Sequence, residues 1–366
     1  MARKGKAVVC RDWNKPVTIE EIQVDSPRAN QVLIQLEAIG VCHSDLSVSN
    51  GTMPIPPPIV LGHEACGRIV ELGEGVTEYQ VGDKVIPCWI PSCGHCRFCA
   101  EGRAVLCDDW AKSFFGPKDG TRPLKDAAGN LLAAMSGVGV MAEYAILHED
   151  NVIKIDPEVP SDKAALVGCA VMTGVGAVLN TARVRPGETV VVVGCGGVGL
   201  NAIQGAAIAN AGVIVAVDVV PAKLELARRL GATHGIDASA GAVAEAVHDL
   251  LGGGADHVFE AIGRKETIEL AVQLVGRGGQ AVLVGLPPPD AAVQIDTLTM
   301  IFEERSIRTS WYGSCRPLVD FPLLLDLYRD GRLRLDLLVS TCTLDEVNDA
   351  FAAMEAGEVA RKVIVF

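Results

Sequence analysis

The strongest constraint on the fold is a stretch without any charged side chain, which extends from Thr189 to Val217. It resembles a membrane span, but glycines interrupt it at Gly194-Cys195-Gly196-Gly197-Val198-Gly199, and amide side chains follow in its second half. A bilayer-spanning helix is normally a continuous apolar run. We therefore interpret the stretch as a buried strand over Thr189–Val193, a tight turn and a buried helix that ends near Ala211, in a soluble protein.

The turn is a G-x-G-x-x-G motif in the context that a dinucleotide site requires. It follows a predicted strand and opens a helix, and Asp218 ends the next strand, 19 residues after Gly199. Gly194, Gly196 and Gly199 would let the backbone approach a pyrophosphate at the helix N-terminus. Asp218 would bind the adenosine ribose and repel the 2′-phosphate of NADP, and the next residues, Val219-Val220-Pro221, offer no arginine to neutralise that phosphate. The motif predicts NAD as the coenzyme; the alternative is a tight turn without a ligand.

Strand-like and helix-like segments alternate from about residue 160 onward. Repeated strand–helix units predict an α/β fold with a parallel, doubly wound sheet. The earlier part of the chain consists of short strands separated by glycine and proline turns. The expected strands are 32–36, 68–72, 189–193, 213–217, 257–261, 280–284, 307–310 and 362–366, and the expected helices are 161–179, 222–230, 321–330 and 344–356.

The composition excludes several classes of protein. With 49% hydrophobic and 21% charged residues, the chain can bury a sizeable core and is not disordered. A formal net charge of −13 would repel phosphate backbones, so nucleic acid is not an expected partner. The N-terminal segment has no apolar stretch before Arg11 and is not a secretory signal. We expect a cytoplasmic protein that binds neither nucleic acid nor a membrane.

Four of the twelve cysteines cluster at Cys93, Cys96, Cys99 and Cys107. In a cytosolic chain such a cluster favours a metal over disulfides. Four thiolates so close in sequence can surround one Zn²⁺ ion tetrahedrally and leave no open position, so this zinc would be structural. An iron–sulfur cluster or incidental buried cysteines are the alternatives.

A second set of metal-binding side chains is dispersed: Cys42, His63 with the adjoining Glu64, and Cys169. Two thiolates and one imidazole, with a fourth position open, describe a catalytic zinc site. The spacing alone leaves this a hypothesis, because a lone cysteine or histidine is more often ordinary core material. We interpret the other cysteines as core residues, namely Cys10, Cys66, Cys88, Cys195, Cys315 and Cys342.

These segments together resemble a known family. The sequence Gly62-His63-Glu64-x2-Gly67-x5-Gly73-x2-Val76 is similar to the signature of the zinc-dependent medium-chain alcohol dehydrogenases of the medium-chain dehydrogenase/reductase superfamily. Val41–Asp45 and Leu166–Cys169 resemble the family's other ligand segments, and the cysteine lobe and the glycine turn follow in the family's order. The resemblance extends from near residue 40 to Arg361.

The resemblance implies a split layout and two zinc ions per chain. A GroES-like, mainly-β catalytic domain would occupy residues 1–170, with the structural-zinc lobe at 93–107. A Rossmann NAD-binding domain would occupy 171–311, and 312–366 would return to the catalytic domain. The resemblance implies that Cys42, His63 and Cys169 bind the catalytic zinc and that Asp45 orients His63. Glu64 would be an occasional extra ligand or an aid to ligand exchange, and Ser44 would hydrogen-bond the bound alcohol. The coenzyme contacts would be Thr173 and Val198 at the nicotinamide, Asp218 and Lys223 at the ribose, and His43 and Arg361 at the pyrophosphate.

The implied reaction is the reversible NAD-dependent oxidation of a primary or secondary alcohol to an aldehyde or ketone. Zinc would lower the pKa of the alcohol, and hydride would pass to the nicotinamide as the carbonyl forms. Spacing from the zinc ligands places Met53 and Trp89 on the wall of the substrate pocket, with Met135 and Trp311 as further candidates. Such a pocket favours aromatic or medium-chain alcohols; the alternative is that these residues belong to the domain cores.

Two other functions stay open. A thiol-dependent formaldehyde dehydrogenase would act on the adduct of formaldehyde with glutathione or mycothiol. Met53 and Ala111 stand where glutathione-dependent enzymes have charged residues, which counts against glutathione, whereas Ser310–Gly313 resembles the mycothiol-dependent group. A non-enzymatic structural or regulatory protein of the same fold is disfavoured, because it would have no need of an open zinc site.

The resemblance also has implications for the oligomeric state and for the group that accepts the proton of the alcohol. The long separation of Cys107 and Cys169 is typical of dimeric members, so we expect a homodimer in which strands 280–284 and 307–310 pair across a twofold axis.

Well-known members have a histidine where this chain has Ser47, and a serine is no base near neutral pH. His43 is then the candidate proton acceptor; alternatively, it only binds the pyrophosphate.

Overall fold

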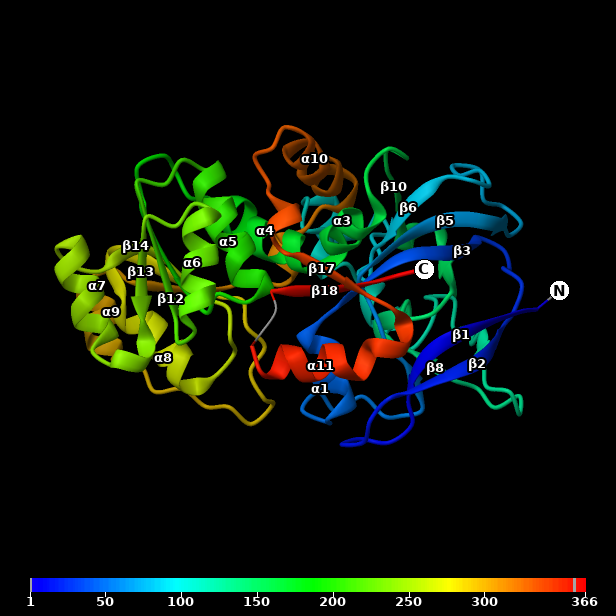
Figure 1. Ribbon diagram of the computed structural model, residues 1–366. Helices are drawn as coiled ribbons and strands as arrows, with labels where there is room; N and C mark the ends of the chain where they lie inside the picture. The colour runs from blue at the N-terminus through cyan, green and yellow to red at the C-terminus, as the bar shows by residue number, and fades with distance from the viewer. Residues whose placement is uncertain (1, 358–359) are drawn as a thin grey trace. The chain divides into compact units, whose positions relative to one another are not determined.

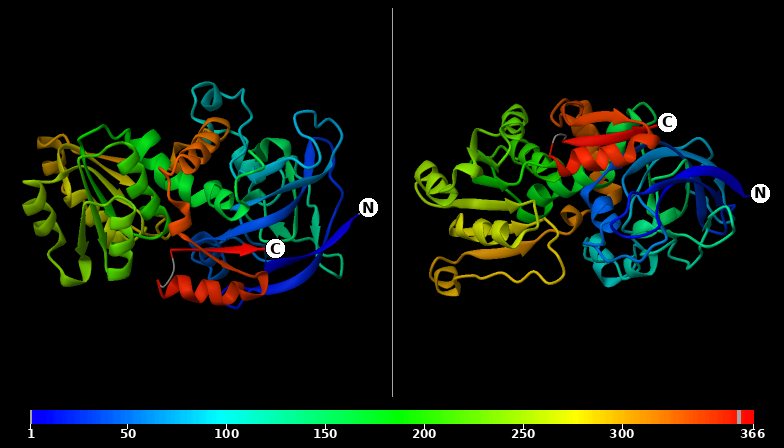
Figure 2. Two further views of the ribbon diagram at one scale, coloured as in Figure 1. Left: turned by 45° about the horizontal axis from the view of Figure 1, so that its top comes forward. Right: turned by 60° about the horizontal axis from the view of Figure 1, so that its bottom comes forward.

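The computed structural model describes residues 2–357 and 360–366, and of Ala111 only the backbone, so the prediction for that side chain lies outside the described part. The chain divides into two compact units (Figures 1 and 2). Unit 1 contains Met1–Cys169, Arg316–Asp326 and Leu338–Phe366. Unit 2 contains Ala170–Cys315 and Leu327–Leu337. Each unit therefore combines segments that are far apart in the sequence.

Unit 1 is built on two mainly antiparallel sheets. The first has the strand order β7-β2-β1-β4-β8 and the second the order β10-β6-β5-β3-β18-β17, with β9 also paired to β3. The strands expected at 32–36 and 68–72 are confirmed as parts of β3 and β5. The bounds are β1 (Arg3–Cys10), β2 (Thr18–Val24), β3 (Gln31–Val41), β4 (Ile59–Val60), β5 (Ala65–Leu72), β6 (Lys84–Pro87), β7 (Leu124–Lys125), β8 (Ala133–Ala134), β9 (Tyr144–His148), β10 (Val152–Lys154), β17 (Val339–Cys342) and β18 (Arg361–Val365).

Strand β3 positions the first group of candidate site residues. It pairs with β5, where Ile39 is opposite Ala65, and with β18, where Val41 is opposite Lys362. The amide of Gly40 also donates a hydrogen bond to the carbonyl of Glu64, at 2.9 Å. The end of β3, the start of β5 and the start of β18 therefore lie side by side.

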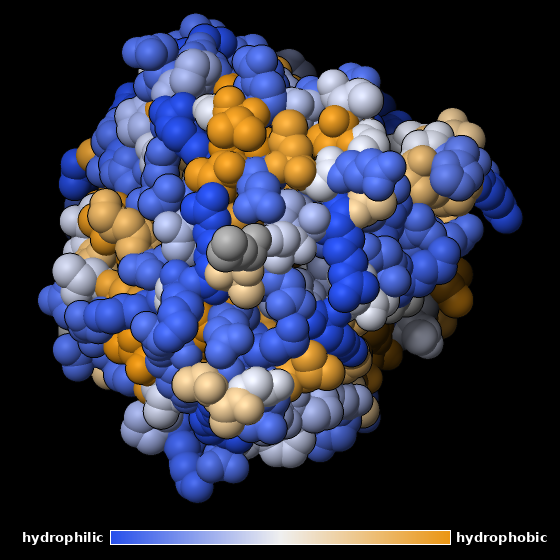
Figure 3. Space-filling view, turned by 90° about the vertical axis from the view of Figure 1, so that its right-hand side faces the viewer, coloured by the Kyte–Doolittle hydropathy of each residue, from blue (hydrophilic) through white to orange (hydrophobic). Residues whose placement is uncertain are grey.

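The face of unit 1 at the right of Figure 1 is mostly hydrophilic, and its apolar side chains gather in small patches (Figure 3). The chain also has exposed large apolar residues, such as Val81 and Leu131. Such scattered apolar residues are normal on protein surfaces.

Unit 2 contains one sheet of parallel strands with the order β13-β12-β11-β14-β15-β16. The order reverses between β11 and β14, and helices lie on both faces of the sheet (Figures 1 and 2). This arrangement confirms the predicted doubly wound parallel sheet. The bounds are β11 (Thr189–Val193), β12 (Val213–Asp218), β13 (His234–Asp237), β14 (Ala255–Glu260), β15 (Val275–Leu283), β16 (Ser306–Thr309), α5 (Gly197–Ile208), α6 (Pro221–Arg229), α7 (Val243–Leu251), α8 (Lys265–Gln273) and α9 (Thr297–Phe302).

The charge-free stretch folds as the strand, turn and helix that we expected. Helix α5 ends at Ile208, before the expected Ala211, because Asn210 adopts a left-handed φ of 58°. Among the described residues, a different segment, Ser161–Ala182, forms a helix that is long and apolar enough to cross a membrane, and 83% of its most apolar 18 residues are buried inside the protein. It is therefore a core helix, in which π-helical turns at Val167–Val171 and Ala177–Ala182 accompany α3 (Ser161–Leu166) and α4 (Met172–Gly176).

The C-terminal part contains the two expected helices with shifted bounds. Helix α10 (Pro317–Arg329) begins before the expected Phe321, because the side chain of Asp320 accepts a hydrogen bond from the amide of Arg316 at 2.6 Å and caps the first turn. Helix α11 (Val347–Glu355) follows a short 3₁₀ turn.

One expectation about assembly is wrong. Strand β15, which contains residues 280–283, is hydrogen-bonded to β14 on one side and to β16 on the other. It therefore has no free edge that could pair with a second subunit. Within the described chain, β16 is the edge strand next to it, so only the 307–310 part of the prediction is compatible with the sheet.

Candidate active site

The first group of candidate residues lies at the ends of three elements of unit 1. Cys42 follows β3 at the N-terminus of α1 (His43–Ser49), His63 and Glu64 precede β5, and Cys169 lies in a π-helical turn. One ligand atom from each of these four side chains lies within 4.8 Å of the others, and all four are buried. The structure therefore brings together the dispersed residues that the sequence singled out.

Asp45 ties two of these segments together. Its buried carboxylate accepts hydrogen bonds from the amides of Cys42, at 3.0 Å, and Gly62, at 2.9 Å. Oδ1 of Asp45 also lies 3.3 Å from Nδ1 of His63, which leaves Nε2 of that ring for a metal. A carboxylate behind a histidine is the usual arrangement that orients a histidine ligand.

Glu64 and Arg361 form a buried ion pair beside this group. Nη2 of Arg361 lies 2.8 and 3.3 Å from the two carboxylate oxygens of Glu64, and Nη1 donates to the carbonyl of Val41 at 3.2 Å. Sequence analysis expected Arg361 at a pyrophosphate and did not foresee this pair, which depends on the pairing of β18 with β3. Nε of Arg361 has no hydrogen-bond partner among the described residues, so one donor stays available.

Burial and neighbouring groups set the charges here. A hydrogen bond with Cys169 lowers the pKa of Cys42 well below its ordinary value and raises the pKa of Cys169. Burial opposes protonation of His63, but the charges of Asp45 and Cys42 raise its pKa well above the ordinary value. Burial raises the pKa of Glu64 to about 8, against the opposing charge of Arg361. A divalent cation would displace these protons, because ligands bind metals in their deprotonated forms.

The remaining catalytic candidates lie on α1. Ser44 is half-buried, and its Oγ lies 3.9 Å from Sγ of Cys42. His43, the first residue of the helix, is exposed, and Ser47 is half-buried. The position of Ser44 next to a candidate ligand is compatible with contact to a bound alcohol, whereas both roles considered for His43 stay predictions.

The predicted pocket residues of unit 1 occupy different environments. The indole N–H of Trp89 donates to the carbonyl of Gly168 at 3.2 Å, and its ring lies edge-on to His63 at 6.1 Å between ring centres. Met53 is partly buried and packs against the core of unit 1, and Met135 is 1% exposed inside that core. Trp89 therefore adjoins the candidate ligands. The position of Met135 fits the alternative that it is a core residue and not part of a pocket wall.

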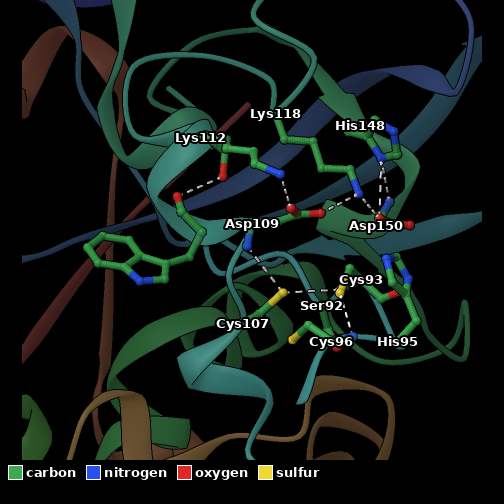
Figure 4. Close-up of polar contacts among 12 residues, drawn as sticks. Ser92, Cys93, His95, Cys96, Cys107, Asp109, Lys112, Lys118, His148 and Asp150 are labelled. Atoms are coloured by element: carbon green, nitrogen blue, oxygen red, sulfur yellow. Dashed lines mark hydrogen bonds and ion pairs between the residues drawn. The ribbon is translucent and has the colours of Figure 1, made fainter. Parts of the chain in front are cut away.

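The second cysteine group is local. The Sγ atoms of Cys93, Cys96, Cys99 and Cys107 lie within 4.8 Å of one another, around the short helix α2 (Arg97–Ala100). Figure 4 shows three of the four, Cys93, Cys96 and Cys107. Sulfurs bound to one zinc at about 2.3 Å lie roughly 3.8 Å apart, and those of Cys93 and Cys99 are 4.0 Å apart. Backbone amides donate to the sulfurs of Cys93, Cys96 and Cys107 at 3.3–3.5 Å. Four thiols in this arrangement can hold one metal ion and leave no open position.

A chain of ion pairs continues from this lobe, which we define as residues 93–107, to the segment after β9. The amide of Asp109 donates to Sγ of Cys107 at 3.5 Å, and its carboxylate contacts Lys112 at 2.5 Å and Lys118 at 3.5 Å. Lys118 also contacts Asp150 (Figure 4). Sequence analysis missed this chain, because no motif connects residues 109, 118 and 150.

In unit 2 the glycine-rich turn joins β11 to α5. Gly194 has a φ of 96°, and a Cβ on Gly199 would lie 1.8 Å from the carbonyl oxygen of Gly194, so both positions require glycine. A Cβ on Gly196, by contrast, would meet nothing within 4 Å. Open space next to a helix N-terminus is the cradle that a pyrophosphate requires.

Asp218 ends β12, as expected, and adjoins this turn. Its carboxylate accepts hydrogen bonds from the amides of Cys195, at 2.7 Å, and Val220, at 2.9 Å. Burial raises the pKa of the Cys195 thiol to about 12, and the nearby charge of Lys223 opposes that shift. Asp218 and Lys223 are therefore both close to the turn.

The two residues expected at the nicotinamide lie on helices in direct contact. A Cβ on Gly174 would lie 2.3 Å from the carbonyl oxygen of Val198, so α4, which carries Thr173, packs closely against α5. Trp311 is half-buried and belongs to unit 2, whereas the other expected pocket residues belong to unit 1.

Comparisons with known proteins add to this geometry. Residues 28–157 match a model described as alcohol dehydrogenase GroES-like domain, and residues 197–330 match one described as zinc-binding dehydrogenase. An NDMA-dependent alcohol dehydrogenase of Amycolatopsis methanolica is 38% identical over 366 residues, which cover 99% of each chain. The structure of an alcohol dehydrogenase zinc-binding domain protein from Burkholderia ambifaria has a TM-score of 0.96 at 33% identity and covers 100% of both chains. That of a benzyl alcohol dehydrogenase from Acinetobacter calcoaceticus has a TM-score of 0.92 at 31% identity, and covers 100% of this chain and 99% of the other.

Proposed function

The chain belongs to the zinc-dependent medium-chain alcohol dehydrogenases, and from this premise we propose that it catalyses the reversible NAD-dependent oxidation of primary or secondary alcohols. The products would be aldehydes or ketones. The observation that carries the proposal is the buried group of Cys42, His63 and Cys169 in unit 1. Two thiols and one imidazole are the donor set of a zinc site that keeps a position open for a substrate.

The protein's own residues would organise that site. Cys42, His63 and Cys169 would hold the zinc, which, when bound, lowers the pKa of an alcohol, while the nicotinamide accepts a hydride. Asp45 accepts hydrogen bonds from the segments that carry two of the candidate ligands and would set the ring orientation of His63, whose Nδ1 lies 3.3 Å from its carboxylate. The half-buried hydroxyl of Ser44 would hydrogen-bond the alcohol and relay its proton, giving up its own proton as it accepts one; the final acceptor would be His43 or, if His43 only binds the pyrophosphate, water.

Glu64 is the fourth group that reaches the site, and Arg361 would decide how often it acts as a ligand. The ion pair between them competes with a metal for the same carboxylate oxygens. Glu64 would therefore join the zinc only occasionally, as an aid to ligand exchange, and leave the open position to the substrate. Arg361 stays a proposed contact of the coenzyme pyrophosphate, as the family resemblance implies.

The coenzyme would bind at the glycine-rich turn of unit 2. Gly196 leaves space beside the N-terminus of α5, and the amides there would bind the pyrophosphate. The carboxylate of Asp218 supports a preference for NAD, because it would repel the 2′-phosphate of NADP and the following Val219-Val220-Pro221 contains no arginine. Thr173 and Val198 would contact the nicotinamide, and Lys223 the ribose.

The substrate pocket would favour aromatic or medium-chain alcohols over ethanol. Trp89, which adjoins His63, and Met53 supply apolar surface, and burial of such surface stabilises a bound ligand by about 25 cal/mol per Å². Similarity to a benzyl alcohol dehydrogenase supports an aromatic substrate. Met135 and Trp311 have weaker support, the first because it is a core residue and the second because it belongs to unit 2.

We further propose a second zinc ion at the four cysteines of the lobe, which would stabilise the fold without taking part in the chemistry.

A homodimer formed through the open edge of β16 stays part of the proposal. Sedimentation equilibrium tests the dimer, and a tetramer would contradict it.

Absorbance at 340 nm with the purified protein tests the reaction. We expect NADH formation from benzyl alcohol and hexanol, with lower KM values than for ethanol, and far less turnover with NADP⁺. The same assay with formaldehyde and added glutathione or mycothiol tests the alternative of a thiol-dependent formaldehyde dehydrogenase, which would form NADH only when the thiol is present. Metal analysis should give two zinc ions per chain. No turnover of any alcohol by protein that contains both zinc ions would refute the proposed function.

A further inference from the structure

Glu260, the last residue of β14, has a role that the proposed function does not yet include. Its carboxylate is fully buried, and Oε1 alone accepts hydrogen bonds from the amides of Ile262, at 2.9 Å, and Gly263, at 2.8 Å, and from the hydroxyl of Thr267, at 2.8 Å. Oε2 has no hydrogen-bond partner among the described residues. One buried side chain thus holds both the loop after β14 and the first turn of α8.

This loop lies at the point where the strand order of the sheet reverses. The amide of Ala261 donates to the carbonyl of Val193, the last residue of β11, at 2.9 Å. A Cβ on Gly194 would lie 2.4 Å from Cγ1 of Ile262, so the loop packs directly against the glycine-rich turn. Open α/β sheets bind their ligands in the crevice at this reversal.

The other side of the loop is equally constrained. A Cβ on Gly263 would lie 2.4 Å from the carbonyl oxygen of Leu286, and one on Gly285 would lie 2.2 Å from the amide nitrogen of Gly263. Ile262 nevertheless keeps 43% of its side chain exposed. The loop thus presents an apolar side chain beside the turn while its backbone is held on both sides.

A buried carboxylate is unfavourable unless donors and local dipoles compensate it, and an apolar residue would fill this position in a sheet at lower cost. The N-terminus of α8 and the three donors supply that compensation. An acidic residue here is therefore explained by what it holds in place rather than by packing.

We propose that Glu260 is a positioning residue of the coenzyme site, which fixes the loop Ala261–Gly263 as the wall beside the glycine-rich turn. The inference rests on the proposed coenzyme site. It implies that Glu260 controls affinity for the coenzyme without contact to the reacting atoms.

The test compares four variants by the quenching of protein fluorescence on titration with NADH. Glu260→Ala removes every acceptor, and Glu260→Gln keeps one oxygen for the loop amides. Thr267→Val removes one donor to Glu260 together with the acceptor of the Arg264 amide. Glu266→Gln is the matched control, because Glu266 is an exposed carboxylate in the first turn of the same helix. Zinc content and thermal unfolding are measured for each.

We expect Glu260→Ala to raise the Kd for NADH about 10- to 100-fold, since hydrogen bonds to a charged group are lost. Glu260→Gln should stay within about 5-fold of the unmodified protein, Thr267→Val should raise Kd about 3-fold, and Glu266→Gln should leave it unchanged. At saturating coenzyme, kcat should fall far less than kcat/KM for the coenzyme. Zinc content should not change.

The role of Glu260 is overturned if Glu260→Ala lowers the melting temperature but binds NADH as tightly as the control does. If Glu260→Ala does not fold, Thr267→Val decides, and an unchanged Kd for that variant overturns the inference. Failure of the unmodified protein to bind NADH would instead refute the proposed coenzyme site, and this inference with it.

Discussion

The two cysteine-containing groups of unit 1 use similar ligands in opposite ways. Cys93, Cys96, Cys99 and Cys107 come from one short stretch, three of them are partly exposed, and backbone amides of the same stretch support their sulfurs. Cys42, His63, Glu64 and Cys169 come from three separate segments, and all are buried. The first group needs only its own loop, whereas the second exists only when the β3 sheet has formed.

The difference teaches where an open coordination position comes from. A short loop can surround a metal with its own side chains and close the site. In the dispersed group, strand pairing sets the places of the ligands, and a buried arginine holds the fourth candidate. The dispersed group can therefore offer three candidate ligands from separate segments, whereas the short loop supplies all four of its own.

The largest effect should come from removing a dispersed ligand. We expect Cys169→Ala to lower kcat/KM for benzyl alcohol at least about 10³-fold, because Lewis-acid stabilisation of several kcal/mol is lost. The chain should still fold and should retain one zinc ion. Atomic absorption together with circular dichroism checks this, and two zinc ions in the variant would contradict the assignment.

The local group should show the converse pattern. Cys96→Ala should release the lobe zinc and lower the melting temperature by at least about 5 °C, since structural zinc contributes folding free energy. The dispersed site should keep its metal and much of its activity at low temperature. Cys342→Ala, a cysteine outside both groups, should keep two zinc ions. Loss of both metals from Cys96→Ala would show that the sites are not independent.

A smaller effect should follow from the carboxylate behind the dispersed ligands. Asp45→Asn keeps the size of the side chain but lacks the charge that orients His63, and such partners typically contribute about 10- to 100-fold in metal affinity or activity. Zinc affinity from competition with a chelator should fall in that range at the dispersed site only. Unchanged affinity would mean that strand pairing alone positions His63.

The smallest effect should come from the ion-pair chain of the lobe. Lys118→Met breaks the contacts with Asp109 and Asp150. We expect zinc to leave the lobe about 3- to 10-fold faster, because a partly buried ion pair contributes modestly to stability. Lys112→Met is the control, because Lys112 also contacts Asp109 but is 64% exposed, and its loss should change the rate little. Equal release rates in the two variants would show that the chain does not anchor the lobe.

Sequence alone determined the features that depend on neighbouring residues. The glycine-rich turn, the Cys93–Cys107 lobe and the alternating elements of unit 2 follow from short-range spacing and β-branched or helical patterns, and they appear where they were expected. Sequence also singled out the dispersed candidate ligands, but only because their segments resemble those of a family. From spacing alone, Cys42, His63 and Cys169 could not be distinguished from core residues.

Only the tertiary structure decided the contacts that depend on strand pairing and loop closure. The pair between Glu64 and Arg361 joins residues 297 positions apart, and it forms because β18 adds to β3. The internal place of β15 and the contact of Lys118 with Asp150 likewise have no local signal. A periodic pattern reports which face of an element is buried, but partners that meet across a sheet are selected by the free energy of the whole packed unit.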